Sequence, residues 1–170
     1  MKAWVVFDTR YGNTERVARA LESGLRESGV ETTCSSLKEA TGRMLSQYDL
    51  ICIGGPTHNR TASENMQKFL ESMAEVKLTG KKGFAFDTRR ESFLAGSAAK
   101  YVEVRLRRLG LKMVYPSESA IVVIHGPERK RTEFEDKDEW KEWRHRNEGL
   151  RDGELKRFEQ LGAVIGSGLT

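Results

Sequence analysis

Apolar and polar positions along the chain follow two periods, one typical of strands and one typical of helices. The run at residues 49–54 is apolar after its first residue, as in a strand covered on both faces, whereas 30–35 is half-polar, as at a sheet edge. Pro116 interrupts the last apolar stretch. The predicted strands are 3–8, 30–35, 49–54, 83–87 and the interrupted stretch 112–115 with 120–124.

Helical periodicity separates these strands. Val17, Leu21 and Leu25 recur every fourth residue after the first strand, so they share one face of a helix. This helix is expected over 13–28, with Gly29 as its C-terminal glycine. Strands that alternate with helices form a parallel sheet covered on both faces. The sequence predicts an α/β fold, a three-layer doubly wound sheet of five parallel strands, with further helices at 62–73, 95–109 and 153–165.

One segment, residues 127–152, does not fit the alternation. It is dense in charges of both signs and contains two tryptophans. Two interpretations stand: an extra helix whose apolar contacts are Phe134, Trp140 and Trp143, or a partly mobile loop. Because 170 residues is the size of one domain, we expect residues 1–170 to form a single domain with this segment inserted between the last strand and the last helix.

The composition is that of a soluble, highly charged protein, with 38% hydrophobic and 32% charged residues. No apolar run approaches the ~20 residues that span a bilayer, and no secretion signal precedes the first strand. Cys34 and Cys52 lie in strand-like segments, so we expect buried reduced thiols, no metal site and a cytoplasmic location. The net charge of +4 comes from interspersed residues, which argues against a nucleic-acid partner.

The stretch D-T-R-Y-G-N-T-E, residues 8–15, joins the first strand to the first helix. A helix N-terminus has unpaired N–H groups and a partial positive charge, so it binds anions, and phosphate above all. Thr9, Asn13 and Thr14 add neutral donors, and Gly12 lets the backbone approach a phosphate. The spacing is that of neither a Walker P-loop nor a G-x-G-x-x-G motif. The stretch is therefore a phosphate cradle, or else a polar turn without a ligand.

Two more polar loops follow the third and fourth strands, G-G-P-T-H-N-R at 54–60 and D-T-R-R at 87–90. Ligands of open α/β sheets bind at the carboxyl ends of the strands, where these three loops would meet. The combination resembles the flavodoxin family: T-R-Y-G-N-T is similar to its T-x-T-G-N-T fingerprint, and P-T-H-N matches its second flavin loop. The resemblance runs from Lys2 to about Gly126 and again over the last helix.

The resemblance implies a sheet order of 2-1-3-4-5 and non-covalent binding of FMN. In that family the first loop holds the phosphate and the other two hold the isoalloxazine ring. Carried over by position, the phosphate contacts would be Thr9, Arg10, Tyr11, Gly12, Asn13 and Thr14; one side of the ring would be lined by Pro56, Thr57, His58 and Asn59; and the pyrimidine edge would be bordered by Asp87, Thr88 and Arg89.

The chain departs from the family pattern in two ways. His58 stands where many flavodoxins stack an aromatic residue on the ring. The alternative is a surface histidine without a role. Asn59 stands where many have glycine, and asparagine tolerates the left-handed backbone that a peptide flip there requires. Arg10 and Arg89 also bring positive charge to a site that is usually acidic. If they face the flavin rather than solvent, the second reduction step should be less negative.

Three functions follow from the resemblance. The first is an FMN-binding electron carrier between partner proteins, acidic ones given the basic surface, in which no side chain is catalytic. The second is an FMN-dependent oxidoreductase similar to quinone reductases or to the flavodoxin-type protoporphyrinogen oxidase, with the insertion over a substrate pocket. The third is a flavin-free binding module on the same fold. The sequence decides neither carrier against enzyme nor the oligomeric state.

Overall fold

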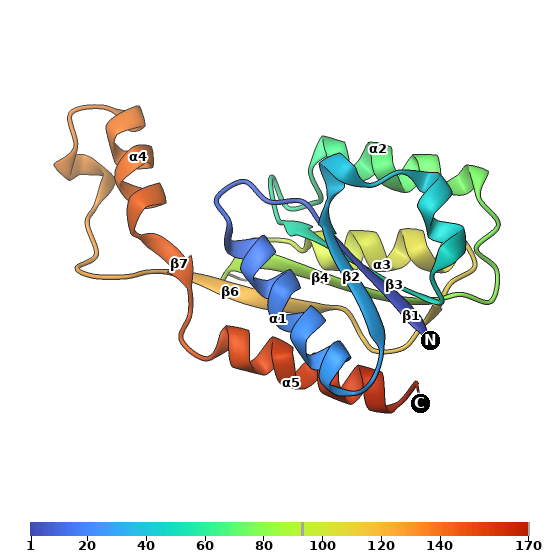
Figure 1. Ribbon diagram of the computed structural model, residues 1–170. Helices are drawn as coiled ribbons and strands as arrows, with labels where there is room; N and C mark the ends of the chain where they lie inside the picture. The colour runs from blue at the N-terminus through green and yellow to red at the C-terminus, as the bar shows by residue number, and fades with distance from the viewer. Residues whose placement is uncertain (93, 170) are drawn as a thin grey trace.

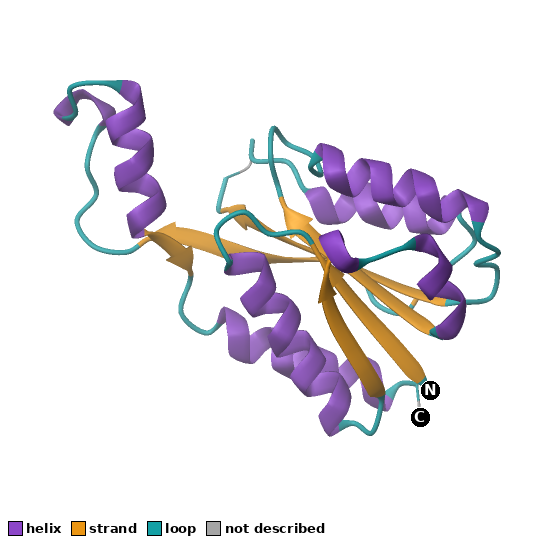
Figure 2. Cartoon of the chain, turned by 45° about the horizontal axis from the view of Figure 1, so that its top comes forward, coloured by secondary structure: helices purple, strands orange, loops and turns teal. Residues whose placement is uncertain are grey.

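The computed structural model describes residues 1–92 and 94–169, and in this part a central sheet lies between two layers of helices (Figures 1 and 2). The strands are β1 (Lys2–Phe7), β2 (Glu31–Ser36), β3 (Leu50–Pro56), β4 (Lys82–Arg90), β5 (Lys112–Met113), β6 (Glu118–Ile124) and β7 (Glu148–Leu150). The α-helices are α1 (Asn13–Glu27), α2 (Glu64–Ser72), α3 (Ala98–Arg108), α4 (Lys137–Asn147) and α5 (Glu154–Ser167). Short 3₁₀ turns are η1 (Leu37–Glu39), η2 (Gly42–Gln47), η3 (Met73–Glu75) and η4 (Arg131–Glu133).

The strand order confirms the predicted doubly wound sheet. It runs β2-β1-β3-β4-β6-β7, and β5 also pairs with β4. Since β5 and β6 both lie parallel to β4, at its start and its end, they are two halves of the predicted fifth strand. Pro116 lies between them, and proline cannot donate a hydrogen bond to the ladder. The parallel register places Gly55 of β3 opposite Asp87 of β4, so the polar loops leave the sheet at one edge.

The sequence did not predict β7, a short strand added to the edge of the predicted parallel sheet. This strand runs antiparallel to β6, with Val123 opposite Gly149. Its three residues, Glu-Gly-Leu, are too few and too mixed to produce a strand pattern. Pairing with β6 creates the strand, and the His125 N–H extends the ladder to the carbonyl of Asn147 at 2.8 Å.

Two apolar clusters cover the two faces of the sheet. One joins β1, β3 and β4 to α1 and α5, and it buries Val17, Leu21 and Leu25 as the helical spacing predicts. The other joins the sheet to α2 and α3. Both cysteines are free; Cys52 is buried as expected, and Cys34 is only partly buried. Burial raises the pKa of both thiols, that of Cys34 to about 12, so neither is a reactive thiolate near neutral pH.

Helices α1 and α5 pack at unusually close range, which two glycines make possible. A Cβ atom added to Gly24 would lie 1.8 Å from the Glu159 carbonyl oxygen, and one added to Gly162 would lie 2.4 Å from that of Leu21. Both obstacles are backbone atoms of the facing helix, which cannot move aside as a side chain can. The glycines therefore set the distance between α1, which follows the first loop, and α5, the last helix of the chain.

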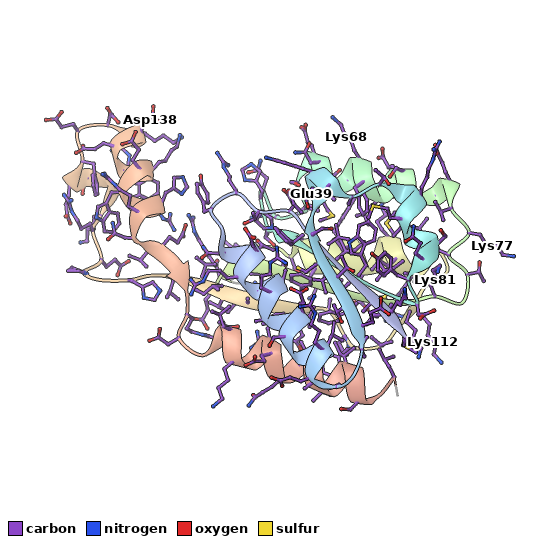
Figure 3. All side chains as sticks on the ribbon, viewed as in Figure 1. Glu39, Lys68, Lys77, Lys81, Lys112 and Asp138 are labelled. Atoms are coloured by element: carbon purple, nitrogen blue, oxygen red, sulfur yellow. The ribbon has the colours of Figure 1, made fainter. Side chains whose placement is uncertain are left out.

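Residues 127–147, here called the arm, contain η4 and α4 and project from the body beyond β7, with Asp138 at their outer end (Figures 1 and 3). The helical interpretation of the insertion is thus the correct one. Asp136 caps α4 by accepting from the N–H groups of Asp138 and Glu139. The arm has a small core of its own, in which the ring centroids of Phe134 and Trp143 lie 5.6 Å apart.

Trp140 differs from the expectation, because it is not stacked with that pair. The guanidinium of Arg144, one turn later, lies 5.0 Å from the centroid of the Trp140 ring. No residue of α4 is fully buried, as expected for a helix that packs on little besides its own side chains. Within the described residues, no helix has the length and apolar character needed to cross a membrane.

We predict that Gly162→Ala lowers the free energy of unfolding by about 3 kcal/mol, the upper end of the cost of overpacking, because the added methyl group meets backbone. Gly168→Ala is the control, since its Cβ would have no neighbour nearer than 3.6 Å. Urea unfolding of both variants measures the difference. Equal midpoints would contradict the close approach of α1 and α5.

Candidate functional site

The loops that follow β1, β3 and β4 open into one cavity of about 1040 Å³. Gly12 and Asp87 are not among its lining residues, but the other residues that the sequence assigned to a ligand are. These are Thr9, Arg10, Tyr11, Asn13, Thr14, Pro56, Thr57, His58, Asn59, Thr88 and Arg89. The fold therefore brings together three segments that lie up to 80 positions apart in the chain.

The first loop leaves the start of α1 free of a side-chain cap. Gly12 precedes the helix with a φ of 85°, and its N–H donates to Thr9 Oγ1 at 3.0 Å. A Cβ at Gly12 would have no neighbour within 4 Å, so the space above the loop is open. The first N–H groups of a helix need partners from outside it. An anion in the cavity would supply them.

A buried hydrogen bond fastens this loop to the sheet. Thr14 Oγ1 lies 2.8 Å from Thr88 Oγ1, and both side chains are buried. At the other end of the loop, the Ser63 hydroxyl, which caps α2, donates to a carboxylate oxygen of Asp8. The loop is thus anchored to β4 and to α2, which fixes the direction in which its N–H groups point.

The second loop is a tight hairpin turn. His58 and Thr61 exchange both backbone hydrogen bonds, at 2.9 and 3.0 Å, and the two residues between them have left-handed φ angles, 46° for Asn59 and 68° for Arg60. This is the pattern of a type I′ turn. Asparagine adopts such angles readily, but arginine seldom does. The lack of a side chain at Gly96 lets the Arg60 backbone approach closely, because a Cβ at Gly96 would lie 2.4 Å from the Arg60 carbonyl oxygen.

Asp87 lies behind the cavity, which corrects the expectation that it borders a ligand. Its side chain is fully buried. One carboxylate oxygen, Oδ2, accepts from the hydroxyls of Thr57 and Ser97, at 2.9 and 2.8 Å, and from the N–H of Ala99 at 3.0 Å. The carboxylate therefore connects the second loop to the start of α3. The sequence pattern could not distinguish an aspartate that contacts a ligand from one that holds the loops that do.

The arm contributes a wall that sequence reasoning missed. Trp140, Lys141, Arg144 and His145 of the arm line the cavity, together with Glu148 at the start of β7. They come from a charged segment that matches no motif, and the one available signal was the spacing of Trp140 and Arg144, which places them on one helix face.

A single aromatic contact joins the arm to the first loop. The hydroxyl of Tyr11 lies 2.8 Å from Nε2 of His145, and the two rings stack with centroids 4.1 Å apart. These residues are 134 positions apart in the chain. Both residues line the cavity, and the contact gives Tyr11, which is half exposed, a packing partner.

The cavity is strongly cationic, because its lining has seven lysines and arginines against two carboxylates, Asp8 and Glu148. Arg10 and Arg89 both line it, so neither belongs only to the outer surface. The Arg89 Nε donates to Ser119 Oγ at 3.0 Å, which holds this guanidinium at the cavity edge. Among the residues that the structure describes, no group of three His, Cys, Asp or Glu side chains could bind a metal ion.

Comparison with known proteins identifies relatives of this arrangement. The family model described as "Flavodoxin domain" matches residues 4–88, half of the chain. A flavodoxin of Clostridium saccharobutylicum is 34% identical over 52% of this chain, and a type A flavoprotein of Rhodobacter capsulatus is 31% identical over 71%. The chain spans only 56% and 28% of those two proteins. Oxidised flavodoxin 1 of Bacillus cereus superposes with a TM-score of 0.75 over the whole of both chains at 22% identity, a likeness of fold.

We predict that the pKa of His145 lies below its ordinary value of about 6.5. Partial burial lowers it first, the positive charges of Arg10, Arg90 and Arg144 lower it further, and Glu148 opposes them. A histidine whose folded pKa is depressed binds fewer protons when folded. Its contribution to stability is complete above the unfolded pKa and is lost as the pH falls through and below it.

The measurement is an NMR titration of the His145 ring. Arg10→Gln should raise the pKa of His145. Arg146→Gln, on the exposed side of the helix that carries His145, should leave that pKa nearly unchanged. A His145 pKa at or above 6.5 in the unaltered protein would show that burial and the three arginines do not act on this ring.

Proposed function

Because the chain belongs to the flavodoxin family, we propose that its cavity binds FMN non-covalently and that the protein carries electrons between partner proteins. The observation that carries this proposal is the convergence of three loops on one cavity beside the uncapped start of α1. Bound FMN would supply one- and two-electron redox chemistry. The protein would supply position, shielding from water and electrostatics, with no catalytic side chain.

The assignment of roles follows the loops. The phosphate would bind at the start of α1, where Gly12 leaves room and the Thr9, Asn13 and Thr14 segment carries the donors. The ring would lie between the hairpin turn at His58 and Asn59 and the end of β4, with Thr88 and Arg89 toward its polar edge. Arg10 and Tyr11 would flank the phosphate, and Pro56 and Thr57 would form the base of the ring site. Asp87 acts from behind by fixing Thr57.

The cationic lining supports acidic redox partners, because complementary charge steers and orients an encounter. Unlike charges raise association rates most at low salt, so the rate of electron transfer to an acidic partner should fall as the ionic strength rises. The two free thiols favour a reducing compartment, which supports the cytoplasm as the place of work.

The first test is the visible absorption spectrum of the purified protein with and without added FMN. Flavin bands that remain with the protein through gel filtration are the expected result, and reductive titration then follows. A colourless protein that does not retain added FMN would refute both the carrier and the enzyme, and it would leave a flavin-free binding module.

An FMN-dependent oxidoreductase is the second candidate. A protein of Rhizobium meliloti named NAD(P)H dehydrogenase (quinone) 3 is 28% identical over 66% of this chain. The cavity is also at the upper end of the ~300–1,000 Å³ typical of a ligand site, and the arm forms one of its walls. Rapid turnover of NAD(P)H and a quinone by the isolated protein would support the enzyme, whereas reversible one-electron reduction without turnover would support the carrier.

Gly12→Ala should weaken FMN binding by about tenfold or more, because the methyl group strains the left-handed backbone of the loop that would hold the phosphate. Gly153→Ala is a matched control: Gly153 precedes α5 with a φ of 88°, also without neighbours within 4 Å. Fluorescence titration of FMN measures affinity, and urea unfolding measures stability. Equal FMN affinities in the two variants would contradict the phosphate assignment.

Arg89→Gln should make the potential of the second reduction of bound FMN more negative, because it removes a fixed positive charge near the ring. Arg89→Lys keeps the charge and should preserve most of the effect. Spectroelectrochemical titration of the three proteins gives the potentials. An unchanged potential in Arg89→Gln would mean that the guanidinium does not act on the flavin.

A further inference from the structure

We propose that the arm side of the cavity is a second ligand site, which binds a small molecule bearing a phosphate or carboxylate group through Arg90, Lys141 and Arg144 beside Trp140. The proposal rests on the proposed function, in which FMN fills the loop side of the same cavity. Arg90 is the last residue of β4, one position beyond the residues assigned to the flavin, and the other three belong to α4.

The positive charge on the arm side of the cavity is only partly balanced by carboxylates. Glu148 is the acidic residue that lines it, and this carboxylate already serves two guanidiniums: both of its oxygens accept from Arg90, and Oε1 lies 3.5 Å from a terminal nitrogen of Arg144. Lys141 is paired with Asp138 at 3.1 Å. Arginine does not lose its proton in proteins, so the two guanidiniums share the single carboxylate of Glu148, and the buried Nε of Arg144 has no hydrogen-bond partner among the described residues. An anionic ligand would supply the missing negative charge.

The FMN phosphate does not remove this excess. A phosphate monoester carries about −1.5 to −2 charges near neutral pH, and seven basic side chains line the cavity against two acidic ones. A net positive charge therefore remains after the phosphate has bound. Three of the seven, Arg90, Lys141 and Arg144, lie on the arm side of the cavity, whereas the phosphate would bind at the start of α1.

Arg144 and its partner Glu148 are recessed, whereas Arg90 and Lys141 are about half exposed, and the recessed guanidinium favours a small molecule over a protein surface. The side chain of Arg144 is 19% exposed and that of Glu148 is 12% exposed. Burial lowers the pKa of Arg144 from its ordinary value, the positive charge of Arg90 lowers it further, and Glu148 opposes both. A guanidinium binds carboxylate or phosphate in a planar, two-pronged manner, and Trp140 offers an aromatic wall for the rest of the ligand.

The test is calorimetric titration of the FMN-loaded protein with two probes, inorganic pyrophosphate and the tricarboxylate tricarballylate, at constant ionic strength. We expect at least one probe to bind with a dissociation constant of about 1 mM or below. Arg144→Gln should weaken binding about tenfold. Arg146→Gln makes the same change of charge on the exposed face of the same helix and should change affinity less than twofold. Circular dichroism and FMN retention check that both variants fold.

Three results would overturn the proposal: no binding of either probe, equal losses in the two variants, or release of FMN by the probe, which would place the anion in the phosphate loop. Binding of an acidic peptide such as octaglutamate without binding of either probe would assign the charge to protein docking instead. If the protein does not retain FMN, the titration is repeated without it in Gly12→Ala. Pyrophosphate binding that depends on Arg144 but not on Gly12 would then keep the second site while the proposed function fails.

Discussion

A buried carboxylate, that of Asp87, determines the geometry of the site. It receives three hydrogen bonds through one oxygen, from the Thr57 hydroxyl, the Ser97 hydroxyl and the Ala99 N–H. A buried polar group costs free energy unless it is hydrogen-bonded, and the three bonds to Oδ2 offset part of that cost, whereas Oδ1 has no partner among the described residues. The loop after β3, the end of β4 and the start of α3 are therefore fixed together, and the hairpin turn is presented from a rigid base.

Unlike Asp87, the arm contributes charged side chains to the cavity rather than rigidity. It packs mainly on itself, through Phe134 and Trp143, and it reaches the body through β7 and the contact between Tyr11 and His145. This attachment brings Arg144 over a cavity whose phosphate loop contains mostly neutral donors. The sheet edge thus supplies the three loops of the cavity, and the arm adds two of the seven basic side chains that line it, Lys141 and Arg144.

The strands, helices and loop positions were readable from the sequence because periodicity and turn residues report local structure directly. The spacing of Leu21 and Leu25 is one such signal. Long-range partners were not readable. Asp87 looked like a ligand contact because its identity says nothing of the Ser97 and Thr57 hydroxyls that surround it. β7 was missed because its hydrogen-bonding partner, rather than its own three residues, makes it a strand.

The antiparallel strand β7 also has a consequence for the solution behaviour of the chain. A free sheet edge exposes unpaired N–H and C=O groups that can recruit a strand from another molecule. β7 covers the end of β6 from Val122 to Ile124, and its three residues are too short to offer an extended edge in turn. At the opposite edge, β2 is a polar Glu-Thr-Thr-Cys-Ser-Ser strand. β7 therefore protects the protein against edge-to-edge aggregation.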